Sequence, residues 1–137
     1  MIRCLSDEGI NVGLVDERSE IAAMYRGIPQ NDIGKRTDVM NNCLKHIGMR
    51  MMIRSMSPQL IATDEIGGEN DERAIEEAGY AGVKLLLTAH GEHIKDISKS
   101  LLEKRIFKNI IVLGKSIQPG FIKNIYSLEE DKYVVRY

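Results

Sequence analysis

The sequence predicts an α/β protein in which helices flank a mainly parallel sheet and an antiparallel hairpin follows at the C-terminus. Two observations support this prediction. Short apolar segments alternate with amphipathic segments along most of the chain, which is typical of strand–helix–strand units. Most of these apolar segments are continuous, as in strands that are buried on both faces. A length of 137 residues is enough for one hydrophobic core, so we expect a single domain over 1–137.

The first 38 residues are expected to contain a helix, a strand and a loop. Apolar residues within 1–8 share one helical face, and Gly9 stands where a helix C-cap glycine is common. Residues 10–15 alternate and predict a strand, which ends in the charged segment 16–20. Residues 27–38 are rich in turn-forming residues and predict a loop.

The middle of the chain is expected to form a helix, a strand and a second helix. Residues 39–55 carry Met and Leu at helical spacing and predict a helix. Residues 60–63 are an apolar run behind Pro58, and their short length favours a buried strand. Residues 71–78 have a helical pattern that closes at Gly79.

The alternation continues toward the C-terminus. Residues 83–88 predict a buried strand, 94–104 a helix, and 106–113 a further strand of the same series. Turn-forming residues then surround two β-prone segments, 121–128 and 133–137, which predict an antiparallel hairpin over roughly 116–137 at the edge of the sheet.

The composition excludes several classes of protein. A formal net charge of -1 provides no broad basic surface for nucleic acid. No segment approaches the roughly 18 to 20 apolar residues of a membrane span, and the N-terminus lacks the apolar core of a signal peptide, so we expect a cytoplasmic protein. Cys4 and Cys43 belong to no metal-binding or redox motif, and we expect each to be a buried, reduced thiol.

Several predicted strands end in residues suited to chemistry, namely Asp16 and Glu17, Asp64 and Glu65, and the segment 88–90. In parallel sheets, ligands bind beyond the carboxyl ends of the strands. The run that ends in Asp64 and Glu65 has the form of a Walker B element, whose first acid holds Mg²⁺ through water and whose second acid orients an attacking water. Acids that merely cap the next helix are the alternative, and this run alone leaves both interpretations open.

A Walker A loop would be the partner of such a site. The segment 29–37 contains Gly34 and Lys35, but Pro29 replaces the first glycine and Arg36 stands where Ser or Thr binds Mg²⁺. Proline also lacks the N–H that a phosphate-binding loop needs. We therefore expect no Walker A loop in this sequence, and Met1 is expected to lie within the helix that follows such a loop.

Two further groups of residues are candidates for chemistry. His90, His93 and Asp96 could form a metal-dependent hydrolase site, but Gly91 interrupts the regular helix that paired histidine ligands use, and zinc is the weaker hypothesis. An arginine finger could come from one of several arginines, and the sequence does not choose among Arg18, Arg26, Arg36 and Arg54.

A series of motifs in order resembles the stage III sporulation protein AA family over roughly residues 1–128. The matching segments are 12–22, 27–34, 36–39, 53–58, 61–67, 81–83 and 88–91. The resemblance implies a RecA-like P-loop NTPase (AAA+) sheet with flanking helices, here lacking the P-loop strand. It also implies a ring-forming homo-oligomer, such as a hexamer, related to type II and type IV secretion ATPases.

The resemblance further implies ATP and Mg²⁺ as cofactors and a role at the channel between mother cell and forespore. Partners would be other channel proteins at the membrane, on the mother-cell side. The residues carried over are Glu65, Glu17, His90 and Arg18 as catalytic, Asp64, Glu20 and Thr88 as cofactor-binding, and Asp64 as metal-binding. Glu17 and Glu20 would support the metal, and His90 would report nucleotide state.

The upstream domain and the Walker A loop of that family have no counterpart in these residues. We therefore expect the chain to be the C-terminal part of one RecA-like ATPase domain and to be inactive by itself. The alternative is a non-catalytic oligomerisation or interaction module that keeps the fold and binds no nucleotide.

Overall fold

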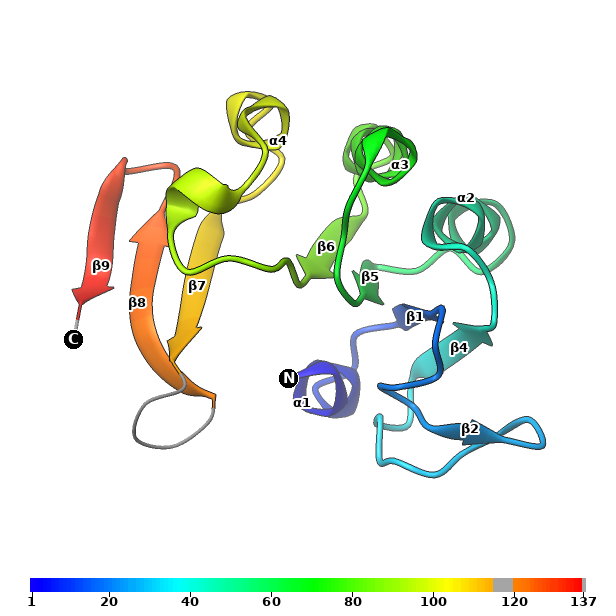
Figure 1. Ribbon diagram of the computed structural model, residues 1–137. Coiled ribbons are helices and arrows are strands. Elements are labelled where there is room, and N and C mark those ends of the chain that lie inside the picture. The colour runs from blue at the N-terminus through cyan, green and yellow to red at the C-terminus, as the bar shows by residue number, and fades with distance from the viewer. Residues whose placement is uncertain (115–119, 137) are drawn as a thin grey trace. The chain divides into compact units, whose positions relative to one another are not determined.

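The computed structural model describes residues 1–114 and 120–136, which fold as two compact units, Met1–Ala89 and His90–Tyr137. The first unit is built on a parallel sheet with helices, and the second on an antiparallel sheet (Figure 1). Within the described residues, no helix is both long enough and apolar enough to cross a membrane.

The sheet of the first unit has four parallel strands in the order β4-β1-β5-β6. These strands are β1 (Val12–Asp16), β4 (Thr37–Asn41), β5 (Leu60–Thr63) and β6 (Lys84–Leu87). Every residue of the two central strands, β1 and β5, is buried, because each has a strand on both sides and further chain over both faces. The predicted parallel α/β arrangement is therefore confirmed for this unit.

Helices cover both faces of the parallel sheet. Its surrounding elements are α1 (Ile2–Asp7), the hairpin β2 (Met24–Tyr25) with β3 (Ile28–Pro29), α2 (Lys45–Ser55) and α3 (Glu69–Tyr80). Figure 1 shows α1 and the hairpin on one face and α2 with α3 on the other. This arrangement places the beginning of α2 and α3 close to the strand ends that carry the candidate residues.

Alternating residues of β1 supply both layers of the core. Val12 and Leu14 belong to a buried cluster against which Leu5 of α1 packs. Val15 points to the opposite face of the sheet, where α2 lies. There, a Cβ atom added to Gly48 of α2 would lie 2.5 Å from Cγ1 of Val15. The strand therefore alternates between the two helical layers, as the pleat of a β-strand requires.

Several boundaries in the first unit differ from the sequence prediction, and the predicted loop 27–38 contains β3 and the first two residues of β4. The predicted helix 39–55 is wrong at its start, because Thr37–Asn41 forms strand β4 beside β1 and the helix begins at Lys45. The polar segment of β4 has little apolar signal of its own, and its pairing with β1 decides its conformation. Helix α3 also runs past Gly79 to Tyr80 instead of closing at that glycine.

The second unit corrects the predicted C-terminal organisation. Its elements are η1 (Ile94–Asp96), α4 (Lys99–Glu103), β7 (Asn109–Gly114), β8 (Phe121–Ser127) and β9 (Lys132–Arg136). The antiparallel hairpin is confirmed as β8 and β9, but it pairs with β7 in a separate three-stranded sheet instead of extending the parallel sheet. The strand predicted at 106–113 as part of the parallel series thus pairs antiparallel with β8.

The helix predicted at 94–104 is also wrong as a continuous element. A 3₁₀ turn and a short helix replace it, with Ile97 in an extended conformation between them. The part of the predicted hairpin at 116–119 lies outside the described residues.

Candidate functional site

The candidate site lies at the carboxyl ends of β1 and β5. The two strands are adjacent and parallel, and Val15 pairs with Thr63 in their register. Glu17 and Asp64 each follow their strand closely, so the fold brings both carboxylates to the same edge. The prediction that the acidic strand ends converge is confirmed for this pair.

Asp16 has a different role from the one its position suggested. Its side chain is fully buried, and its two carboxylate oxygens accept hydrogen bonds from the backbone N–H groups of Glu20, Ile21 and Ala22, the last at 2.8 Å. These bonds hold the loop after β1 and satisfy the buried charge. Asp16 therefore organises the loop behind the site and is not free to bind a ligand.

Lys45 is the residue that sequence reasoning missed. It is the first residue of α2, its side chain is only 10% exposed, and its Nζ lies 3.1 Å from Oε2 of Glu17 and 3.5 Å from Oδ1 of Asp64. Lysine is a common surface residue, so only knowledge that α2 begins beside both strand ends could have identified it.

The two acids and Lys45 stabilise one another's charges. The hydrogen bond from Lys45 lowers the pKa of Glu17 below its ordinary value, although burial opposes this shift. Burial disfavours the charge of Lys45, but its hydrogen bond to Glu17 and the charge of Asp64 outweigh that effect and raise the pKa of Lys45. Glu17 is therefore a carboxylate and Lys45 an ammonium group at neutral pH.

Asp64 and Glu65 differ strongly in exposure. The Asp64 side chain is 16% exposed, and its buried Oδ1 accepts no hydrogen bond within the described part of the chain. Glu65 is exposed, with its Oε2 3.9 Å from Nη1 of Arg18. Thr88 fixes the backbone beside them, because its hydroxyl oxygen accepts the Glu65 N–H at 2.8 Å and its carbonyl accepts the Ile66 N–H.

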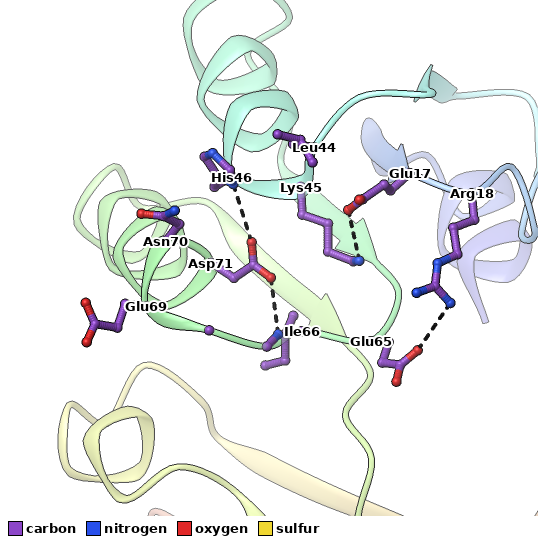
Figure 2. Close-up of a pocket in the computed structure, with 12 residues that line it drawn as sticks. Glu17, Arg18, Leu44, Lys45, His46, Glu65, Ile66, Glu69, Asn70 and Asp71 are labelled. Atoms are coloured by element: carbon purple, nitrogen blue, oxygen red, sulfur yellow. Dashed lines mark hydrogen bonds and ion pairs between the residues drawn. The ribbon is translucent and has the colours of Figure 1, made fainter.

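An open pocket of about 430 Å³ lies beside this cluster. Figure 2 shows its lining, where Lys45 points toward Glu17 and Arg18 points toward Glu65. On the far wall, Asp71 accepts a hydrogen bond from the Gly67 N–H, and its other oxygen lies 3.8 Å from Nδ1 of His46. The pocket is thus lined by the first turns of α2 and α3 and by acidic and basic side chains together.

The two remaining predicted site residues are Glu20 and His90. The Glu20 side chain is exposed, and its backbone N–H is bound by Asp16. His90 belongs to the second compact unit, whereas Glu17, Asp64 and Glu65 belong to the first. The structure therefore brings together Glu17, Arg18, Asp64, Glu65 and Thr88 from the predicted set.

The weaker candidates have other contacts. Asp96 accepts the backbone N–H groups of Glu92 and His93, and the described residues contain no group of three or more His, Cys, Asp or Glu side chains arranged to hold a metal ion. Arg26 lies over the ring of Tyr25, and Arg36 donates to Asn11.

Both cysteines are free, but the prediction that they are buried is wrong. Cys4 is exposed and Cys43 is half-buried. The apolar face of α1 is made by Ile2 and Leu5, so Cys4 does not contribute to the core.

The chain is similar to known proteins over most of its length. A family described as "Sporulation stage III, protein AA" matches residues 1–133. "Stage III sporulation protein AA" of Bacillus subtilis (strain 168) is 45% identical over 122 residues, which are 85% of this chain and 40% of that relative. The chain therefore spans less than half of this relative's length.

Two relatives from other organisms match a shorter segment. "Uncharacterized protein ycf45" of Porphyra purpurea is 35% identical over 101 residues, covering 72% of this chain and 18% of the relative. "Protein SEEDLING PLASTID DEVELOPMENT 1" of Arabidopsis thaliana is 36% identical over 101 residues, covering 72% of this chain and 15% of the relative.

Proposed function

Because the chain belongs to the sporulation stage III protein AA family, we propose that it is part of a ring-forming sporulation ATPase and supplies the metal-binding and water-orienting side of the ATP site. In this proposal, the contacts to the ATP phosphates come from polypeptide outside these 137 residues. ATP hydrolysis by the assembled ring would drive assembly or transport at the channel between mother cell and forespore.

The observation that carries this proposal is the carboxylate of Asp64. It stands at the end of a fully buried central strand and is largely enclosed, and its Oδ1, which faces the Lys45 ammonium at 3.5 Å, accepts no hydrogen bond within the described residues. Buried acceptors are normally satisfied, so this oxygen is suited to a cation or its water shell. When bound there, Mg²⁺ would neutralise charge on the phosphate oxygens of ATP.

Each neighbouring residue has a role that follows from its contacts. Glu65 is exposed beside Asp64, where its carboxylate can accept a hydrogen bond from the attacking water. Thr88 holds the Glu65 backbone in place through its hydroxyl oxygen. Glu17 adds a second negative charge near Asp64, and Arg18, which faces Glu65, would meet negative charge on the reacting phosphate.

A hybrid protein tests this proposal. The segment of the Bacillus subtilis relative that matches this chain is replaced by the chain, and Mg²⁺-dependent ATP hydrolysis is measured for the purified hybrid. Glu65→Gln in the hybrid is expected to reduce hydrolysis by about 10²-fold or more while ATP still binds, because the amide cannot act as a base. Spore formation by cells that carry the hybrid in place of their own protein provides a second readout.

Asp38→Asn is a matched control, since it removes an exposed carboxylate of β4 outside the pocket. It should leave hydrolysis and spore formation unchanged. A folded hybrid that supports spore formation equally well with Glu65 or Gln at this position would contradict the catalytic proposal and favour a non-catalytic interaction module.

A further inference from the structure

Lys45 occupies the space between two carboxylates of the proposed metal site. Its ammonium group lies 3.1 Å from Glu17 and 3.5 Å from Asp64, and its side chain is nine-tenths buried. One positive charge faces two negative charges, so the cluster keeps a net charge of about -1 in an environment that screens charge poorly. Such a cluster still attracts a further cation.

The two contacts of Lys45 are unequal. The contact to Glu17 is a hydrogen bond, whereas Asp64 Oδ1 accepts no hydrogen bond within the described part of the chain. Lys45 is therefore held more closely by Glu17 than by Asp64. The longer contact, to Asp64, is the weaker of the two and the one that a competing cation displaces at the smaller cost.

The pocket offers Lys45 other carboxylates. Lys45 itself lines the pocket together with Glu17, Glu65, Glu69 and Asp71 (Figure 2). The lysine side chain has four flexible methylene groups and a compact charge, so it can change acceptors at small cost. The pocket therefore holds further carboxylates besides the one of Glu17 that Lys45 contacts.

We propose that Lys45 is a positioning residue that pairs with Asp64 in the absence of metal and releases this carboxylate when a divalent cation binds. The inference rests on the proposed function, because Asp64 is the metal-binding residue in both. Lys45 prevents repulsion between Glu17 and Asp64 in the metal-free state and lowers the affinity of the site for metal. A fixed structural ion pair, by contrast, would keep its Asp64 contact whether metal is bound or not.

Mg²⁺ binding by calorimetry separates these two roles. Lys45→Gln removes the competing charge and is expected to raise Mg²⁺ affinity on the order of tenfold. The free energy that corresponds to a tenfold change in affinity is smaller than the interaction energy of two unit charges about 4 Å apart at a partly buried site. Lys45→Arg keeps the charge and should bind Mg²⁺ no more tightly than the original chain. Lys35→Gln is the matched control for net charge, because Lys35 is exposed and does not line the pocket.

Nuclear magnetic resonance of the unaltered chain avoids the risk that Lys45→Gln fails to fold. The ammonium protons of Lys45 should be protected from exchange in the metal-free chain and should lose this protection as Mg²⁺ is added. In Asp64→Asn the same titration should leave the Lys45 signal unchanged. Loss of protection in step with Mg²⁺ binding supports the proposal.

The outcomes distinguish the inference from the proposed function. Saturable Mg²⁺ binding that requires Asp64 but leaves the Lys45 signal and the Lys45→Gln affinity unchanged would overturn the inference alone. No Mg²⁺ binding by the original chain or by a folded Lys45→Gln variant would likewise overturn the inference, whereas the proposed function is overturned separately, by unchanged ATP hydrolysis in the Glu65→Gln hybrid.

Discussion

Asp16 and Glu17 are consecutive residues whose carboxylates serve different partners. Asp16 is fully buried and binds the backbone N–H groups of the following loop, whereas Glu17 binds the side chain of Lys45 at 3.1 Å. The last residue of β1 thus fixes the loop, and the next residue is turned toward α2. Their substitution should therefore affect different properties of the protein.

Asp16→Asn is expected to destabilise the fold. The amide nitrogen cannot accept a hydrogen bond, so at least one buried N–H of the loop loses its partner, at a cost of about 2 to 3 kcal/mol in the free energy of unfolding. Urea denaturation followed by circular dichroism measures this change. Asp38→Asn, on an exposed residue, should change stability by less than about 0.5 kcal/mol, and an equal loss in both variants would contradict the role given to Asp16.

Asp64→Asn and Glu65→Gln should differ in the hybrid with the Bacillus subtilis relative. Asp64→Asn should weaken metal-dependent ATP binding as well as turnover, because the carboxylate that holds the metal is lost. Glu65→Gln should reduce turnover and leave binding in place. ATP affinity, hydrolysis rate and melting temperature measured on both variants test this separation.

If the two acids only cap the helix after β5, a different result follows. Each substitution would then cost roughly 0.5 to 2 kcal/mol of stability and leave turnover per folded molecule unchanged. That pattern in both variants would exclude the assigned chemistry.

Gly48→Ala is expected to destabilise the first unit by about 1 to 2 kcal/mol, although alanine favours helices. The added Cβ atom would lie 2.5 Å from Cγ1 of Val15, so the α2–β1 contact must open, and this cost exceeds the gain of about 1 kcal/mol in helix propensity. Thermal or urea unfolding measures the change.

Two variants control for this interpretation. Gly67→Ala should be nearly neutral, because nothing lies within 4 Å of its added Cβ atom. Val15→Ala should make the Gly48→Ala substitution less costly in the double variant, since it removes the atom that clashes. Purely additive effects would show that the close approach is not the cause.

The Arg50–Glu77 pair should make stability depend on pH. Arg50 donates two hydrogen bonds to Glu77, at 2.7 and 2.8 Å, and these lower the pKa of the Glu77 carboxyl, against the opposing effect of burial. Because the pKa of the Glu77 carboxyl is lower in the folded state, the ionised carboxylate stabilises the fold at pH values above the unfolded pKa of 4.5. This stabilisation is lost as the pH falls through the lowered pKa. The original chain should therefore exceed Arg50→Gln in stability at neutral pH, and the difference should vanish in acid.

Urea unfolding at a series of pH values measures this difference. Arg73→Gln is the comparison, because Arg73 makes one exposed contact of 3.8 Å to Glu69 and should give a smaller pH-dependent difference. A stability difference for Arg50→Gln that persists below the lowered pKa would contradict the assignment.

The chain is expected to self-associate through the edge of β6. Within the described residues β6 pairs with β5 alone. The backbone N–H of Lys84 donates to the Gln59 carbonyl, on the side of β6 that faces β5. Because successive N–H groups of a strand point to opposite sides, those of Leu85 and Leu87 point away from β5, to the unpaired edge. Light scattering over a micromolar concentration series should show growing mass. Amide exchange at Leu85 and Leu87 should slow with concentration, and a monodisperse monomer throughout would count against this prediction.

The sequence by itself determined the elements whose signal is local. Strand β5 was predicted with its observed bounds, because four apolar residues stand between turn-forming and acidic residues and a buried strand is their stable state. The acidic ends of β1 and β5 were also predicted to meet, since parallel strands place their carboxyl ends at one edge. The parallel sheet and the C-terminal hairpin followed from the same local patterns.

Only the tertiary structure decided the features that depend on distant neighbours. Strand β4 exists because Thr37–Asn41 pairs with β1, and its own polar sequence gives little indication of this. Whether an acid or a lysine joins the site depends on which groups the fold places within hydrogen-bonding reach. Thus Asp16 became a loop-holding residue and Lys45 the partner of two carboxylates, because burial and the positions of α2 and the loop after β1 determine where each charge is stabilised.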